Sequence, residues 1–214
     1  MRRLSVVILV LYGCLAPLCG QNTQEIVSSF TQKLSTYECL YATYTFSISD
    51  GNGGIKYSVD GEFFSQGDSF PVSTDASDIY CDGISKCIYD KFNEEVIIIG
   101  HDTSDGNMSE NPLIVLSNAS SAYNYSKKPQ LIDFQGEKCY NITLAPKSEK
   151  ADHVAVDILI TQGDYSVKGI CYTSRNGELY RAVIKSISGL DRKPDSFFTL
   201  DVDSMEDVLV TDLR

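Results

Sequence analysis

The hydrophobic and polar positions between Ile79 and Gly100 predict three short strands joined by two tight turns. The first turn is Asp82-Gly83, a dipeptide that favours hairpins because glycine adopts a positive φ without steric cost. Asp90 to Glu94 forms the second turn. Val96 to Ile99 then continues as an unbroken β-branched run, which suits a pleated surface. We interpret this stretch as the centre of an antiparallel meander.

A period of two also marks the region before this meander. Hydrophobic residues alternate with polar ones from Leu40 to Ile48, which predicts a half-buried strand. The glycine-rich segment Asp50 to Gly54 is a turn signal, and a second strand follows from Ile55 to Phe64. Phe70 to Val72 begins a short third strand. Pro71 restricts that strand to a sheet edge or a bulge, because proline has no N–H to donate.

Further strands are predicted after the meander. Residues 117–129 show little periodicity, so we expect a loop or a flap there. Asn176-Gly177 is another strong hairpin signal. The six strands expected in this region are Leu131–Phe134, Cys139–Leu144, Val154–Thr161, Ser166–Tyr172, Leu179–Ile187 and Phe197–Val202.

Two segments carry helical signals instead. Asn22 or Thr23 can cap an amphipathic helix of about 12 to 15 residues at the start of the chain. Asn111-Pro112 is predicted to be an N-cap followed by proline at the first helical position, which leads Leu113 to Leu116 into a short helix. The apolar stripe of the first helix consists of Ile26, Val27, Phe30 and Leu34.

Together these elements predict an α+β fold built on one curled antiparallel sheet of about ten or eleven strands. The two helices are expected to lie as a lid over the concave face of this sheet. No internal repeat or linker divides the chain, so residues 21–214 are predicted to form a single domain.

Residues 1–20 are predicted to be a secretory signal peptide that is removed between Gly20 and Gln21. Arg2-Arg3 supplies its positive start, and the apolar run that follows is too short to span a bilayer. A second interpretation treats Cys14 as a lipidation site, although the bulky Tyr12 argues against it. We therefore expect an exported protein.

The acidity of the chain limits its partners. Its formal net charge of −11 is expected to repel nucleic acid and anionic membrane surfaces. After the leader, no apolar run is long enough for a transmembrane helix. A soluble, exported domain that does not bind nucleic acid is the resulting prediction.

Five cysteines follow the leader, namely Cys39, Cys81, Cys87, Cys139 and Cys171. An odd number leaves at least one of them without a partner in a monomer. Cys81 and Cys87 flank the first turn of the meander and are a possible disulfide, provided that the register places them opposite each other. A zinc site is less favoured because CxxC pairs are absent and histidines are scarce. We therefore predict no metal site.

Catalytic signals are nearly absent from the sequence. The chain has two histidines, His101 in a predicted loop and His153 at the start of a strand, and a Ser-His-Asp site stays open because geometry alone defines it. No nucleophile elbow, HExxH motif, P-loop or dinucleotide fingerprint occurs. Asp102 to Glu110 lacks the alternating acids of a calcium loop. We predict a protein that is not an enzyme and needs no cofactor.

The remaining candidate for function is the apolar surface of the early strands. Its side chains either fill a core or, if the helices can lift, line a cavity for an acyl chain, whose burial contributes about 0.8 kcal/mol per CH₂. The residues alone favour the core. The lipid-cavity candidates are Tyr44, Phe46, Ile48, Val59, Phe63, Phe70 and Val72.

Several short motifs occur in the order found in one known family. Val59 to Phe63 and Gly67 to Phe70 resemble its paired-strand motif, and Cys81 to Asp90 resembles its hairpin. Leu144 to Lys147 and Val208 to Arg214 resemble later segments. The family is that of the LolA-like periplasmic outer-membrane lipoprotein carriers, in particular those of Bacteroidota, and the resemblance covers nearly all of the chain after the leader.

The resemblance implies an incomplete β-barrel closed by helices around a hydrophobic cavity. A monomeric periplasmic carrier of this kind takes the acyl chains of lipoproteins from an inner-membrane ABC exporter and passes them to an outer-membrane acceptor. Pro71 stands where the family commonly has an arginine that helps to close the lid, so that role is not carried over. The alternative is an envelope interaction or structural protein on the same fold, with a filled core and no lipid cargo.

Overall fold

The computed structural model describes residues 22–101, 113, 115–126 and 128–214. The predicted signal peptide with Cys14, the predicted cap Asn111-Pro112 and the acidic segment Asp102 to Glu110 lie outside these residues. The described residues form thirteen strands, two α-helices and two short 3-10 helices.

All thirteen strands belong to one sheet, in the order β13-β6-β5-β4-β3-β2-β1-β12-β11-β10-β9-β7, with β8 paired to β9 off this path. Neighbours run antiparallel, except that β13 runs parallel to β6. The strands are β1 (Cys39–Ser49), β2 (Ile55–Ser65), β3 (Phe70–Thr74), β4 (Ser77–Cys81), β5 (Ser85–Asp90), β6 (Glu95–Gly100), β7 (Tyr123–Tyr125), β8 (Gln130–Phe134), β9 (Glu137–Pro146), β10 (His153–Thr161), β11 (Val167–Ser174), β12 (Leu179–Leu190) and β13 (Leu209–Asp212).

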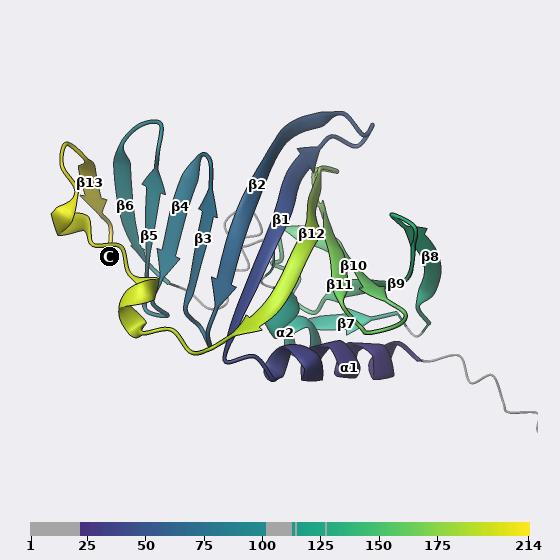
Figure 1. The fold of residues 1–214 in the computed structure, drawn as a ribbon. Coiled ribbons are helices and arrows are strands. Elements are labelled where there is room, and N and C mark those ends of the chain that lie inside the picture. The colour runs from purple at the N-terminus through teal and green to yellow at the C-terminus, as the bar shows by residue number, and fades with distance from the viewer. Residues whose placement is uncertain (1–21, 102–112, 114, 127) are drawn as a thin grey trace, which may run out of the picture.

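The sheet curls without closing. Its path ends at β13 on one side and at β7 on the other, and these two described strands do not pair with each other. Figure 1 shows α1 (Thr23–Ser35) lying across one end of the curled sheet, with α2 (Val115–Ala122) next to it. The predicted α+β architecture, an incomplete barrel with helices as a lid, is confirmed.

Helix α1 begins where the sequence predicts. The Oδ1 of Asn22 accepts a hydrogen bond from the N–H of Glu25 at 2.9 Å, and the Asn22 amide donates to Glu25 Oε1 at 3.1 Å. The first bond satisfies a backbone N–H of the first helical turn, and the second joins the two side chains. Ile26, Val27 and Phe30 are buried under the helix, as its apolar stripe predicts.

The link from α1 to β1 is fixed by a close contact with β12. The ring of Tyr37 lies against Gly189, where an added Cβ would stand only 2.2 Å from the ring carbon Cδ1. Any larger residue at position 189 would push the ring away. This contact holds the end of α1 beside the central strands of the sheet.

The prediction of a loop at residues 117–129 is wrong. Helix α2 and strand β7 occupy most of it, and α2 buries Val115 and Ala119 in the core. Small and polar residues dominate this segment, so its own periodicity is weak. Packing against the rest of the protein stabilises the helix, as it does for most short helices.

The prediction of a strand at Phe197–Val202 is also wrong. Two 3-10 helices, η1 (Asp195–Phe198) and η2 (Val202–Ser204), occur there instead. The tight turn brings both phenylalanine rings against neighbours: Phe197 lies 5.0 Å from the ring of Phe64, and Phe198 is buried. The segment then continues to β13, for which the sequence offers no separate prediction.

Pro71 lies in β3, between β2 and β4, and not at an edge of the sheet. It pairs with Tyr80 of β4, while the β2–β3 ladder begins only at Val72. The missing N–H of the proline therefore interrupts no ladder with β2. An interior strand tolerates the proline because its pairing on that side is short.

The predicted disulfide between Cys81 and Cys87 is not formed. The hairpin register pairs Cys81 with Lys86 and Cys87 with Tyr80, so the two sulfurs lie on opposite faces of the sheet. All five cysteines in the described residues are free thiols. A disulfide would require Cys81 to pair with Cys87, and the observed register differs from that pairing by one residue.

Candidate functional site

The concave face of the sheet, which we call the inner face, carries the apolar residues predicted from the sequence. Tyr44, Phe46, Phe63, Phe70 and Val72 are buried in one hydrophobic cluster, and Ile48 and Val59 pack against it half-buried. The same cluster includes Ile26, Val27 and Phe30 of α1 and Val115 and Ala119 of α2. The seven candidates therefore belong to one hydrophobic cluster that also includes residues of both helices.

Tyr44 crosses from β1 to β2 over Gly61, its partner in the ladder. A Cβ at position 61 would stand 2.8 Å from both Cζ and the hydroxyl oxygen of the tyrosine. Burial holds the pKa of Tyr44 well above its ordinary value, with the nearby Tyr57 as a lesser cause. The phenol stays neutral, so the inner face carries no charge at this point.

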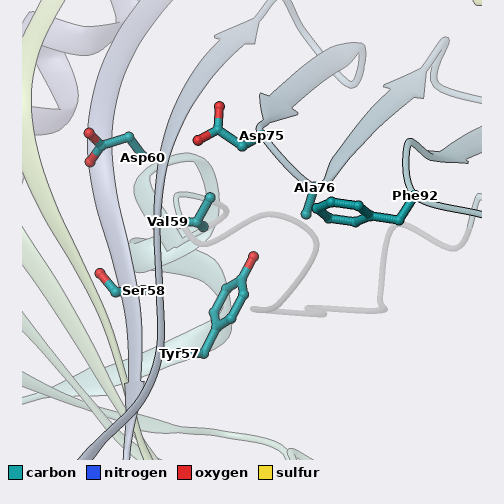
Figure 2. Close-up of a pocket in the computed structure, with 7 residues that line it drawn as sticks. All are labelled: Tyr57, Ser58, Val59, Asp60, Asp75, Ala76 and Phe92. Carbon is teal, nitrogen blue, oxygen red and sulfur yellow. The ribbon is translucent and has the colours of Figure 1, made fainter.

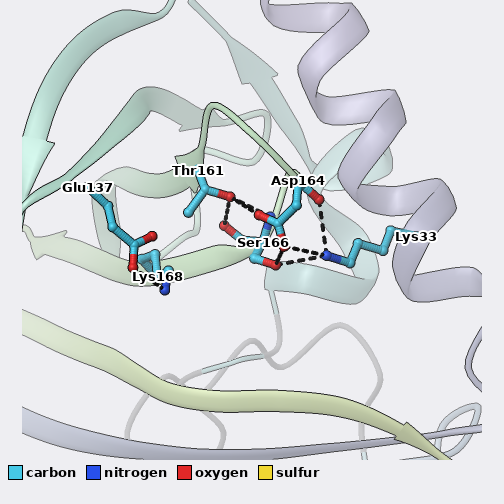
Figure 3. A network of polar contacts seen from close by, with 6 residues as sticks. All are labelled: Lys33, Glu137, Thr161, Asp164, Ser166 and Lys168. Carbon is cyan, nitrogen blue, oxygen red and sulfur yellow. Dashed lines mark hydrogen bonds and ion pairs between the residues drawn. The ribbon is translucent and has the colours of Figure 1, made fainter.

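Helix α1 is joined to the sheet through a polar cluster at its last turn, which we call the α1 latch (Figure 3). The Nζ of Lys33 donates to the carbonyl oxygen and the carboxylate of Asp164, at 3.0 and 3.1 Å, and to Ser166 Oγ at 2.8 Å. Asp164 in turn accepts hydrogen bonds from the hydroxyls of Ser166 and Thr161.

The hydrogen bonds of the α1 latch favour the ionised form of its carboxylate. Hydrogen bonds from Ser166, then Thr161 and Lys33, hold the pKa of Asp164 far below its usual range. Among the described residues, these bonds of Lys33 are the only side-chain hydrogen bonds from α1 to the sheet. A single ionic cluster therefore fastens the polar side of the helix.

Two buried polar groups of α1 lack hydrogen-bond partners among the described residues. The hydroxyl oxygens of Thr23 and Thr31 are buried without a hydrogen-bond partner among the described residues. An unsatisfied buried polar group typically costs about 1–3 kcal/mol relative to its hydrated state. Lifting the helix would return both hydroxyls to water, which lowers the cost of opening the lid.

His153 belongs to a closed hydrogen-bonded row. Its Nε2 lies 3.1 Å from the hydroxyl of Tyr123, and its Nδ1 lies 2.8 Å from Asp152 Oδ1. Burial, with a smaller contribution from Asp152, raises the pKa of Tyr123 to about 12. His153 is only 5% exposed, and its bond to Tyr123 ties β7 to β10.

His101 stands apart from His153. Its ring meets Phe70 edge-on at 5.9 Å, and its backbone N–H donates to the carbonyl of Ile84 at 2.8 Å. Neither histidine shares a hydrogen bond with a serine or cysteine among the described residues. The described chain also contains no group of three His, Cys, Asp or Glu side chains arranged to hold a metal.

No family model and no curated protein sequence matches this chain. Among solved structures, an uncharacterized conserved protein from Thermus thermophilus is similar over 88% of this chain and 98% of its own, with a TM-score of 0.56 and 9% identity. At that identity the likeness establishes a shared fold alone.

Two further structures are similar at lower scores. A LolA superfamily protein from Nitrosomonas europaea is 12% identical over 85% of this chain and 99% of its own, with a TM-score of 0.48. The lipoprotein LppX from Mycobacterium tuberculosis is 12% identical over 80% of this chain and 100% of its own, with a TM-score of 0.45.

None of the helices in the described residues is long and apolar enough to cross a membrane.

Proposed function

We propose that this protein is an exported, non-catalytic carrier that binds an acyl chain of a lipoprotein, or another lipid, on its inner face beneath α1. The observation that supports the proposal is the set of contacts that hold α1 on the sheet. The apolar face of α1 belongs to the same hydrophobic cluster as the inner face of the sheet. Among the described residues, two buried hydroxyls of α1 are nevertheless unsatisfied, and one ionic cluster fastens the helix.

The energies of the two states are of similar size. Lifting α1 exposes Ile26, Val27 and Phe30, at about 1.5–3 kcal/mol each for full exposure. An acyl chain that buries ten or so methylenes in their place would contribute about 8 kcal/mol at 0.8 kcal/mol each. Near-balance is what a carrier requires, because a cargo held far more tightly than the closed lid would not be released.

The cellular setting of the proposal comes from the sequence. The leader at residues 1–20 would export the chain, and the motif resemblance suggests a divergent LolA-like carrier in the periplasm. Its partners would then be an inner-membrane ABC exporter and an outer-membrane acceptor. The protein would act as a monomer, because one chain supplies both the sheet and the lid.

The second candidate is an envelope interaction or structural protein with a filled core. The burial of Tyr44, Phe46, Phe63, Phe70 and Val72 favours it, since each of these side chains is already packed. The two candidates differ in whether α1 gives way to a ligand.

Uptake of a fluorescent fatty acid separates them. We expect the purified protein to bind 11-(dansylamino)undecanoic acid, and the variant Lys33→Met, which breaks the α1 latch, to take it up faster. Lys56→Met is the matched control, because it removes a surface ion pair with Glu178 (2.7 Å) that does not involve the lid. Absence of uptake by all three proteins, together with a lipid-free mass of protein isolated from its source envelope, would favour the filled core.

A further inference from the structure

Strand β2 is paired along its whole length on one side only. Strand β1 pairs with it from Ile55 to Ser65, whereas β3 pairs only with Gly61 to Phe63. No other described strand pairs with the stretch Ile55–Asp60. In an antiparallel strand, alternate residues direct both their N–H and C=O groups to the same side. Away from β1, this stretch therefore presents backbone donors and acceptors that no described strand pairs, and such an edge accepts an additional strand.

A groove of about 430 Å³ follows this unpaired edge (Figure 2). Two hairpin turns form its other wall: the β3–β4 turn and the β5–β6 turn. Successive residues of β2, which point to alternate faces of the sheet, all line it, so the groove follows the strand edge and not one face. The lining residues are Tyr57, Ser58, Val59, Asp60, Asp75, Ala76 and Phe92.

The groove has an aromatic end and an acidic end. Phe92 is 79% exposed at the tip of its turn, and in Figure 2 its ring extends toward Ala76. The carboxylate of Asp60 is paired with Lys185 at 2.6 Å, whereas Asp75 makes no side-chain hydrogen bond or ion pair with another described residue. The charge available to a ligand in the groove is therefore negative.

We propose that this groove binds an extended segment of a partner polypeptide, which adds a strand to the open edge of β2. Main-chain hydrogen bonds to Ile55–Asp60 supply the affinity, as in other cases of strand addition. A lysine or arginine of the segment pairs with Asp75, and an apolar side chain lies against Phe92 and Tyr57. The net charge of −11 further attracts a basic segment. This proposal is independent of lipid carriage, because it leaves the lid closed.

A fluorescein-labelled peptide of eight residues, alternating valine and threonine with one central lysine, tests the proposal on the full domain. We expect saturable binding by fluorescence anisotropy. The same peptide with glutamate for lysine should bind about fivefold more weakly or worse. A version methylated on alternate backbone nitrogens should not bind, because it cannot donate hydrogen bonds to the strand edge.

Two variants and two matched controls locate the site. Asp75→Asn should abolish the preference for lysine over glutamate, while Asp203→Asn, an exposed acid on η2, should preserve it. Phe92→Ser should weaken binding about fivefold or more. Ile84→Ser should not, because Ile84 is an equally exposed hydrophobic residue in the turn at the opposite end of β5.

Three results would overturn the proposal. The first is no binding of the lysine peptide, and the second is equal binding of the N-methylated peptide, which would show that the backbone edge is not used. The third is a dimer in sedimentation that Phe92→Ser dissociates, which would assign the groove to a second copy of this chain. None of these results bears on fatty-acid uptake, so the two proposals stand or fall separately.

Discussion

Lys33 and Asp164 are 131 positions apart in the sequence, and their charged groups lie 3.1 Å from each other. The contact joins the last turn of α1 to the turn between β10 and β11 (Figure 3). It fastens the lid at the end of the helix opposite to its capped start. Among the described residues, this contact is therefore the polar attachment of α1, and it lies outside the apolar core.

Loss of this contact should loosen the helix more than it destabilises the domain. For Lys33→Met we expect the free energy of unfolding to fall by about 0.5–1 kcal/mol, because both partners are partly exposed. Hydrogen exchange of the α1 amides should accelerate, while exchange in β1 and β12 stays unchanged. Urea unfolding and exchange mass spectrometry measure the two effects, with Lys56→Met as the control. Equal acceleration throughout the sheet would contradict a local latch.

The α1 latch also makes a defined contribution to acid stability. The pKa of Asp164 is depressed in the folded state, so its contribution is present above the unfolded pKa of about 4 and is lost as the pH falls. The difference in stability between the natural protein and Asp164→Asn should therefore be largest near neutral pH. It should shrink below about pH 4. Urea unfolding at a series of pH values measures it, and a difference independent of pH would contradict the ionised carboxylate.

The contact between Tyr44 and Gly61 predicts a costly glycine substitution. An alanine Cβ at position 61 would stand 2.8 Å from the tyrosine ring, so the ring must move within a packed face. We expect Gly61→Ala to lower the free energy of unfolding by about 1–3 kcal/mol. Gly100→Ala is the control, because a Cβ there meets no atom within 4 Å. Equal stability of the two variants would show that Tyr44 has room to shift.

The cysteines should behave as five separate thiols in the chain without its leader. Cys39, Cys81 and Cys139 are fully buried, and burial raises the pKa of all five sulfhydryls. Iodoacetamide at neutral pH should therefore label Cys87 and Cys171 slowly and the other three only after unfolding. Peptide mass mapping measures the labelling. Recovery of a peptide pair joined through Cys81 and Cys87 would contradict the hairpin register.

Local patterns predict much of this fold. Asn22 and the apolar stripe after it define α1, and alternation defines β1, because both signals lie within a dozen residues. Strand β13 is different: it is four residues long and mostly exposed, and it pairs with β6, more than a hundred positions earlier. The partner of such a long-range pairing cannot be predicted from the residues of the segment itself.

The candidate site shows the same division. The seven apolar residues of the inner face follow from alternation on the early strands, since the period fixes the face. The α1 latch does not follow, because Lys33 is an ordinary surface residue until the fold brings Asp164 to it. The open edge of β2 is also invisible in sequence, where nothing shows that β3 pairs with only three of its residues.

The pairing of β1 with β12 places Cys39 opposite Leu190, so the two halves of the sheet join through residues from opposite ends of the domain. Contacts of such long range slow folding, because closing a long loop costs entropy before the strand pairing can stabilise the chain. The chain cannot complete its central ladder until nearly all of it is available. A newly made chain will therefore stay unfolded for longer than a small helical protein, and this delay suits the export that we propose for this chain.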